Sequence, residues 1–247
     1  AMDYIIDADP LVPIRICNIA HEAAFEPKDD CKATWYEHTP EGVSESSAVA
    51  YFFALRLYKA LRIPVGVINT SWESTAIQAW MNRELLDSEF AGEFDMTHFQ
   101  TRELKGKRYP YNKPGVLYNA MINPLIDFPI KGVLWYQGCS NVGAAVQHES
   151  LFQTLIQEWR DKWQQPDMPF SFAQLANYLT PRDVQPDSEW ALLRETQEKA
   201  LTLHNTGMAC NIDIGDAKDI HPKSKRELGR RMAAIALHKT YGKKDVV

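Results

Sequence analysis

What this sequence lacks already excludes several classes of protein. None of its apolar runs approaches the roughly 20 residues that a membrane-spanning helix needs. It has no cluster of basic residues and its net charge is −5, which disfavours binding to nucleic acid or to an anionic membrane surface. Its four cysteines show no Cys-x-x-Cys spacing, which argues against a structural zinc site. These absences favour a globular domain that acts on something other than a polyanion.

The cysteines are few and widely spaced, at Cys17, Cys31, Cys139 and Cys210. Cys17 and Cys210 lie in or beside apolar runs, and this position predicts buried thiols. A disulfide between Cys17 and Cys31, which would close a short loop, is the alternative for that pair.

Strand-like and helix-like patterns alternate along the chain. The predicted strands are residues 14–19, 65–69, 132–136, 170–175 and 208–212. The predicted helices are residues 47–61, 77–86, 115–126, 148–164, 190–203 and 223–241. Segments 27–46 and 87–114 show no clear period and are predicted to be irregular. The alternation is typical of a parallel sheet covered by helices, and 247 residues suffice for one α/β domain with a sizeable core.

The segment from Ile212 to Lys223 carries the strongest chemical signal. It reads Ile-Asp-Ile-Gly-Asp-Ala-Lys-Asp-Ile-His-Pro-Lys, an apolar strand end followed by a loop with three aspartates and one histidine. A histidine near a carboxylate, on a loop between a strand and a helix, is typical of the base half of a Ser-His-Asp hydrolase. Pro222 restricts the backbone just before it, which suits a loop that must aim a ring. The alternative is a loop that only caps the following helix.

Two other predicted strands also end in polar loops. The predicted strand 132–136 is followed by Gln-Gly-Cys-Ser-Asn, residues 137–141. The predicted strand 65–69 is followed by Thr-Ser-Trp-Glu-Ser-Thr, residues 70–75. Parallel α/β folds place ligand-binding groups in the loops at the carboxyl ends of their strands. Three such strand ends predict one site at the carboxyl edge of a sheet.

Together these segments resemble the characteristic blocks of the sialate O-acetylesterase-like branch of the SGNH hydrolases, a family of carbohydrate esterases. Residues 135–141 resemble the block Trp-Tyr-Gln-Gly-Glu-Ser-Asn, and residues 219–231 resemble the block that begins Asp-Ile-His-Pro and ends Leu-Gly-Arg-Arg. Residues 65–72 resemble the second block, and further matches follow in family order at 47–53, 158–160, 172–176 and 193–197. The resemblance implies a three-layer α/β sandwich of the flavodoxin-like SGNH type, with a short parallel sheet.

The sequence departs from this family pattern in three places. The first block resembles Gly-Gln-Ser-Asn-Met in the family and carries the nucleophilic serine, but residues 13–16 already resemble the strand that follows it. The second block ends Ser-Trp-Gly-Gly-Thr in the family, whereas Glu73 and Ser74 stand here where a glycine amide helps to form the oxyanion hole. Cys139 replaces the glutamate of the third block. We therefore expect residues 1–247 to form a single SGNH-type domain, truncated at its N-terminus and with an incomplete site.

The resemblance also implies roles for individual residues. His221 would act as the general base, and Asp219 would orient its ring, with Asp216 as the alternative partner. Asn141 would donate to the oxyanion. Its neighbour Ser140 imitates a nucleophile because residues 138–141 read Gly-Cys-Ser-Asn, but in the family this loop serves the oxyanion.

Three further residues are candidates for substrate contact. Gln137 lies in the third block, Arg194 lies on the predicted helix 190–203, and Trp72 follows the second strand. An aromatic ring such as that of Trp72 can stack on a sugar face, although large aromatic side chains more often pack in a core. Each of the three therefore has a purely structural alternative.

The chemistry implied by the resemblance is the hydrolysis of acetyl esters on sugars. The protein would be a carbohydrate O-acetylesterase of the sialate 9-O-acetylesterase or acetylxylan esterase type, using a Ser-His-Asp mechanism whose serine is absent from this chain. Its partners would be an acetylated sugar or oligosaccharide and a complementing N-terminal segment. No metal or cofactor is implied, and a periplasmic or secreted location is expected. The alternative is a non-catalytic carbohydrate-binding or structural relic of the family, which Glu73 favours.

Overall fold

The computed structural model describes residues 2–105, 109–184 and 186–245. Its strands are β1 (Ile14–Ile19), β2 (Ala33–Glu37), β3 (Val65–Asn69), β4 (Val133–Trp135), β5 (Phe170–Ala173) and β6 (Thr206–Ala209). Its α-helices are α1 (Met2–Ile6), α2 (Pro40–Ser44), α3 (Ala48–Leu61), α4 (Arg83–Glu89), α5 (Thr97–Thr101), α6 (Ala145–Lys162), α7 (Glu189–Lys199) and α8 (Lys225–Lys239). The 3₁₀ turns are η1 (Ile77–Trp80), η3 (Asn123–Leu125), η4 (Cys139–Ala144) and η5 (Ala200–Thr202), and η2 (Tyr118–Ile122) is a π-helical turn.

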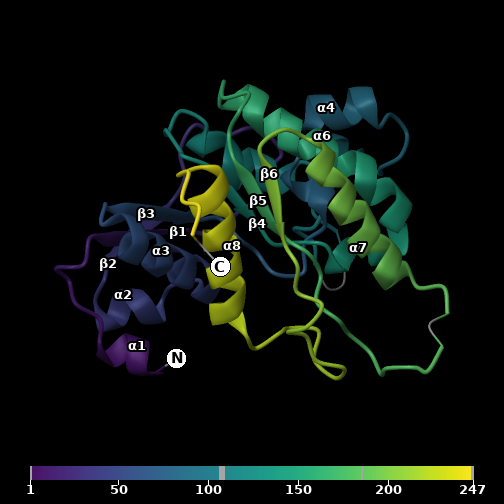
Figure 1. Cartoon of the computed structure of the whole chain (residues 1–247). Coiled ribbons are helices and arrows are strands. Elements are labelled where there is room, and N and C mark those ends of the chain that lie inside the picture. Colours follow the sequence, from purple (N-terminus) through teal and green to yellow (C-terminus); the bar gives the residue numbers. More distant parts are fainter. Residues whose placement is uncertain (1, 106–108, 185, 246–247) are drawn as a thin grey trace.

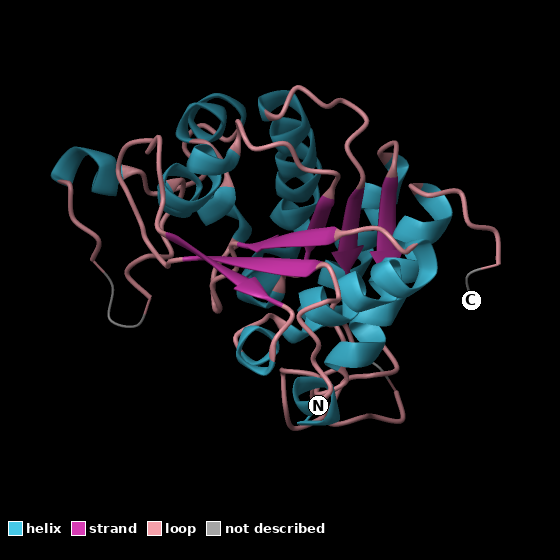
Figure 2. Ribbon diagram, turned by 90° about the vertical axis from the view of Figure 1, so that its left-hand side faces the viewer, coloured by secondary structure: helices cyan, strands magenta, loops and turns pink. Residues whose placement is uncertain are grey.

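The strands form two three-stranded sheets rather than one. The first has the order β2-β1-β3, in which β1 pairs with β3 in parallel and with β2 in antiparallel fashion. The second has the order β4-β5-β6 and is entirely parallel. Figure 2 shows the strands of the first sheet running across the direction of those in the second. As a result β3 and β4 are edge strands, each hydrogen-bonded on one side only.

Helices cover the sheets from two sides, which confirms the predicted layered α/β architecture. Helices α3 and α8 pack against each other, α3 over β1 and β3 and α8 over β5 and β6. Helices α6 and α7 form a second pair on the other side, as Figure 1 shows. The largest core cluster lies under α6, where Phe152 packs against Trp135, Phe170 and Phe172. Burial of these large rings removes much apolar surface from water and so stabilises this layer.

Most predicted elements are present, with shifted ends. The strands 14–19 and 65–69 match β1 and β3 residue for residue. The predicted helix 77–86 is instead the turn η1 followed by α4, because the Asn82 side chain accepts hydrogen bonds from Glu84 N and Leu85 N and so starts a new helix. The predicted strand 208–212 is β6, which ends at Ala209 because its partner β5 ends at Ala173.

Strand β2 lies within the segment predicted to be irregular. Four of its five residues are exposed, and it is held by antiparallel pairing with β1. An exposed strand of this kind has no alternation of buried and solvent-facing residues for a sequence pattern to reveal.

All four cysteines are free thiols in the structure, so the alternative of a Cys17–Cys31 disulfide is wrong here. Cys17 is buried, as predicted, and burial raises the pKa of its thiol. Cys210 is exposed, contrary to the prediction, because β6 has ended one residue earlier and the chain has turned out of the sheet.

Candidate active site

All the candidate residues except Arg194 lie on loops or turns that follow the carboxyl ends of strands. Residues 70–76 follow β3, residues 136–141 follow β4, and residues 210–224 follow β6. Hydrogen bonds and charges between these loops, rather than one continuous sheet, hold them in place.

His221 is paired with Asp219. The Oδ1 atom of Asp219 accepts a hydrogen bond from the backbone N–H of His221 at 2.9 Å, and the ring Nδ1 lies 3.5 Å from the same oxygen. The Oδ1 atom of Asp216 accepts instead from the Lys218 N–H at 2.8 Å, which forms a local turn. The His221 side chain is 77% exposed, so its other ring nitrogen faces solvent or a partner.

Lys225 links this pair to the loop after β4. Burial lowers the pKa of its ammonium group, while the charge of Asp219 and the thiol of Cys139 act on it in the opposite direction. Its Nζ atom lies 5.0 Å from the ring centroid of Tyr136, within the range of a cation–π contact. Lys225 therefore contacts the loop after β4 through Tyr136, and the charge of Asp219 acts on it.

Asn141 is a buried junction between the loops after β3 and β4. Its Oδ1 atom accepts hydrogen bonds from the Ile77 N–H at 2.9 Å and from Gln137 Nε2 at 2.7 Å, and its Nδ2 atom donates to Gln78 Oε1 at 3.1 Å. Gln137 also donates to the carbonyl of Thr75 at 3.1 Å. The structure therefore brings Asn141 and Gln137 together, and their amides fix the loop that contains Glu73.

Gln197, on α7, supports the same junction by binding the backbone of Gln137. Its side chain is buried, accepts from the Leu175 N–H at 2.9 Å, and donates to the carbonyl of Gln137 at 3.1 Å. Gly138, between them, has φ = 155°, and a Cβ atom there would lie 3.1 Å from Gln197 Nε2. Gln78 was not assigned a role from the sequence, and Gln197 stands three residues after Arg194 on the same helix.

Arg194 is not joined to the other candidates. It is half-buried on α7, and its carbonyl accepts from Gln174 Nε2 at 3.3 Å. Within the part of the chain that the structure describes, its guanidinium makes no hydrogen bond or ion pair. It is thus a free cation on the helix that supports the Gln137 loop.

Trp72 is the middle ring of a three-ring stack. His21 stacks on one face at 4.4 Å between centroids, and Tyr111 stacks on the other at 3.9 Å. His21 Nε2 also lies 3.0 Å from the carbonyl of Ser71, which ties the chain after β1 to the chain after β3. Because both faces of Trp72 are covered, a sugar ring can stack only on an outer ring of this group.

Glu73 is exposed and lies on the side of Tyr111. The Tyr111 hydroxyl is 3.5 Å from the Glu73 carbonyl, and the pKa of Tyr111 is raised by burial, by Tyr109 and by the charge of Glu73. No hydrogen bond or ion pair joins Glu73 to His221 or Asn141 among the described residues.

Two features are absent from the described residues. No group of three or more His, Cys, Asp or Glu side chains there is arranged to hold a metal ion. No helix there combines the length and the apolar character needed to cross a membrane.

Solved structures resemble this chain in fold, and one of them also resembles it in sequence. A carbohydrate acetylesterase from Xanthomonas citri has a crystal structure that matches with a TM-score of 0.85 and 35% identity, over 98% of this chain and 52% of its own. A protein from Arabidopsis thaliana matches in fold alone, with a TM-score of 0.55 and 19% identity, over 90% of this chain and 80% of its own.

Curated relatives agree with the structural match. The sialate O-acetylesterases of Homo sapiens and Pongo abelii are each 28% identical over 260 residues, which cover 94% of this chain and 48% of theirs. The chain therefore spans about half the length of these relatives. The family described as "Carbohydrate esterase, sialic acid-specific acetylesterase" matches residues 12–238, and the chain belongs to this family.

Proposed function

We propose that this chain is part of a carbohydrate O-acetylesterase that hydrolyses acetyl esters on sugars by a Ser-His-Asp mechanism. The observation that carries the proposal is the His221–Asp219 pair, at 3.5 Å, on an exposed loop at the carboxyl edge of the strands. In this mechanism His221 takes the proton of a serine hydroxyl, and Asp219, rather than Asp216, holds the ring and stabilises the imidazolium.

The nucleophilic serine of this proposal comes from a complementing segment. Within the described residues no serine hydroxyl forms a hydrogen bond with His221, and Ser140, on η4, is the weaker alternative. Edge strand β3 supports the idea of a missing neighbour, because all five of its residues are exposed or half-exposed although three are Val or Ile. The four residues of β5, which has a neighbour on both sides, are all buried. A strand added beside β3 or β4 would complete residues 1–247 into one SGNH-type domain.

The remaining candidates have supporting places in this proposal. Asn141 and Gln137 hold the loop that faces the oxyanion, and Asn141 is also the candidate donor to it. Arg194 supplies a free cation for a substrate oxygen. Trp72 sets the position of the His21 ring, whose exposed outer face is the one available for a sugar. An acetylated sialic acid or a xylan-type sugar is the substrate, and the location is periplasmic or secreted.

Ester hydrolysis tests the proposal directly. We expect the chain alone to hydrolyse 4-nitrophenyl acetate poorly, and to gain activity when a segment with the Gly-x-Ser-Asn block of a family member is added or fused. The gain should vanish in His221→Asn and persist in His204→Asn, a change at another exposed histidine. Ordinary turnover by the chain alone, lost in Ser140→Ala or Cys139→Ser, would disprove the assignment of the nucleophile.

A second function, sugar binding without catalysis, is favoured by one observation. Glu73 places a carboxylate in the loop where an oxyanion donor is expected, and a negative charge there opposes the transition state. If the complemented chain binds acetylated sugars in calorimetry but does not hydrolyse them, and Glu73→Gly does not restore turnover, the non-catalytic function is the correct one.

A further inference from the structure

Few residues of the loop that carries His221 are buried. Of residues 210–224, which we call the His221 loop, only Asn211 and Pro222 are buried. A catalytic base must nevertheless be kept within a fraction of an ångström of its working position. The first residues of the loop are anchored, because Ile214 packs against a core cluster and Asn211 Nδ2 donates to the Gln174 carbonyl at 2.9 Å. The exposed remainder needs further interactions to keep it in place.

Arg231, the seventh residue of α8, binds the start of this loop. Its Nη1 and Nη2 atoms donate to the two carboxylate oxygens of Asp213 at 2.6 and 2.5 Å, and Nη1 also donates to the carbonyl of Cys210. Its Nε atom donates to Glu227 Oε1 at 2.9 Å, which holds the guanidinium flat against its own helix. We call this group of Arg231, Asp213, Glu227 and the Cys210 carbonyl the Arg231 clamp.

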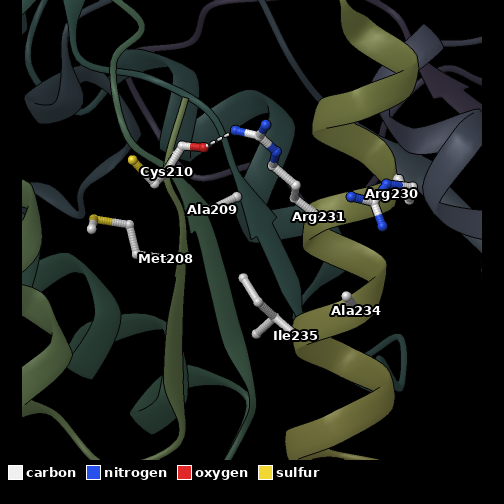
Figure 3. A pocket seen from close by; sticks show the side chains of 7 residues that line it. All are labelled: Met208, Ala209, Cys210, Arg230, Arg231, Ala234 and Ile235. Carbon is white, nitrogen blue, oxygen red and sulfur yellow. Dashed lines mark hydrogen bonds between the residues drawn. The ribbon is translucent and has the colours of Figure 1, made fainter. Parts of the chain in front are cut away.

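The clamp ties together the two ends of the His221 loop. Cys210 is the first residue after β6, and Arg231 belongs to the helix that follows the loop. Figure 3 shows the Arg231 side chain reaching from α8 to the Cys210 carbonyl, beside an open cavity of about 330 Å³ that Met208 and Ile235 also line. On this open side, the hydrogen bonds of Arg231 join the start of the loop to α8.

The geometry of the clamp requires arginine. Three nitrogens of one planar group donate in different directions, including a bidentate pair to one carboxylate. A lysine keeps the charge but presents a single nitrogen and cannot form this fork. Hydrogen bonds from Arg231 lower the pKa of Asp213 to about 2, and those from Arg230 and Arg231 lower the pKa of Glu227 to about 2. The clamp therefore stays charged at neutral pH.

We infer that Arg231 is a positioning residue for the catalytic base: through Asp213 and the Cys210 carbonyl it fixes the loop that presents Asp219 and His221. The inference rests on the proposed function for its catalytic meaning, but the ordering of the loop does not depend on that function. Arg231 touches neither of the two catalytic residues in the hydrogen bonds described above.

Hydrogen exchange of the 247-residue chain, followed by mass spectrometry, tests the inference. In Arg231→Lys we expect amides of residues 211–224 to exchange about tenfold faster or more, while β5 and α6 keep their protection. Asp213→Asn should give the same loop-specific change, and the double variant little more than either alone, because both break one interaction. The ring signals of His221 in NMR spectra should shift or broaden in both variants.

Lys239→Ala is the matched control. Lys239 is on the same helix and also donates to a backbone carbonyl, that of Thr206 at 2.7 Å, at the opposite end of β6 from Cys210. Its loss should lower overall stability without selective exchange in the His221 loop. The inference is overturned if Arg231→Lys leaves the loop unchanged, or if Lys239→Ala loosens it equally.

The esterase assay separates this inference from the proposed function. In a complemented, active protein Arg231→Lys should lower kcat with little change in KM. If no esterase activity can be obtained, exchange in residues 211–224 still decides whether the clamp orders the loop.

Discussion

The buried carboxyl group of Glu158 predicts a loss of stability at alkaline pH. Glu158 lies on α6 and is 6% exposed. Its Oε1 atom accepts from the Asn82 N–H at 2.8 Å, but its Oε2 atom is buried with no hydrogen-bond partner among the described residues. Burial is the largest cause that raises its pKa from 4.5 to about 8. The folded chain therefore prefers the neutral acid near neutral pH.

The direction and size of the effect follow from linkage. The pKa of Glu158 is higher in the folded chain than in the unfolded chain. Its contribution to the free energy of unfolding is therefore fully present below the unfolded pKa and is lost as the pH rises through the folded pKa. Each pH unit between the two values is worth about 1.4 kcal/mol. Glu158 should thus lower the free energy of unfolding by roughly 4 kcal/mol between about pH 5 and about pH 9.

Glu158→Gln removes this dependence while keeping the side-chain shape. The amide oxygen can still accept from Asn82 N–H, and the neutral group resembles the protonated acid. Urea unfolding of wild type and variant across that pH range should show the variant gaining stability over wild type by roughly 4 kcal/mol towards alkaline pH. Glu198→Gln, at an exposed glutamate of α7, should show no such trend. If the difference in free energy of unfolding between wild type and Glu158→Gln does not change with pH, the carboxylate is charged and hydrated in the folded state.

Three further outcomes are expected. His148 is fully buried, and burial lowers its pKa to about 4. Wild type should therefore lose roughly 3 kcal/mol in its free energy of unfolding as the pH falls from about 6.5 to about 4. His148→Gln should remove this loss at acid pH, as measured by urea unfolding. Gly215→Ala places a Cβ atom 2.2 Å from the carbonyl oxygen of Asn177 and should therefore speed hydrogen exchange in residues 211–224. Gly66→Ala should not, because a Cβ atom at Gly66 would have no heavy-atom neighbour within 4 Å among the described residues. Asn141→Ala leaves the Ile77 N–H and Gln137 without their acceptor and should cost roughly 2–4 kcal/mol in urea unfolding, against almost nothing for exposed Ser140→Ala.

The parts of the site that could be predicted from the sequence are those with local signals. An apolar run that stops at a polar loop marks the end of a buried strand, and this located the loops after β3, β4 and β6. The pairing of Asp219 with His221 is also local, since an aspartate two residues before a histidine can accept its backbone N–H, as it does at 2.9 Å. The catalytic roles of these residues remain predictions.

Long-range contacts could not be predicted in this way. The amides of Gln78 and Gln197 meet the loop 137–141 across separations of 63 and 60 residues, and glutamine on a helix carries no pattern that names its partner. The division of the strands into two sheets is equally hidden, because β3 and β4 have the apolar composition of interior strands. Only the exposure of their residues distinguishes them from β5.

The two sides of the site differ in what holds them, and this difference suits their proposed tasks. Around Asn141 the contacts are neutral amide hydrogen bonds between buried and partly buried groups, which hold the proposed oxyanion loop independently of pH and salt. The His221 loop is held instead by a partly exposed, charged clamp, with the Arg231 and Asp213 side chains 24% and 57% exposed. Exposed ion pairs weaken as salt rises. High salt should therefore loosen the loop that carries the base before it disturbs the amide junction.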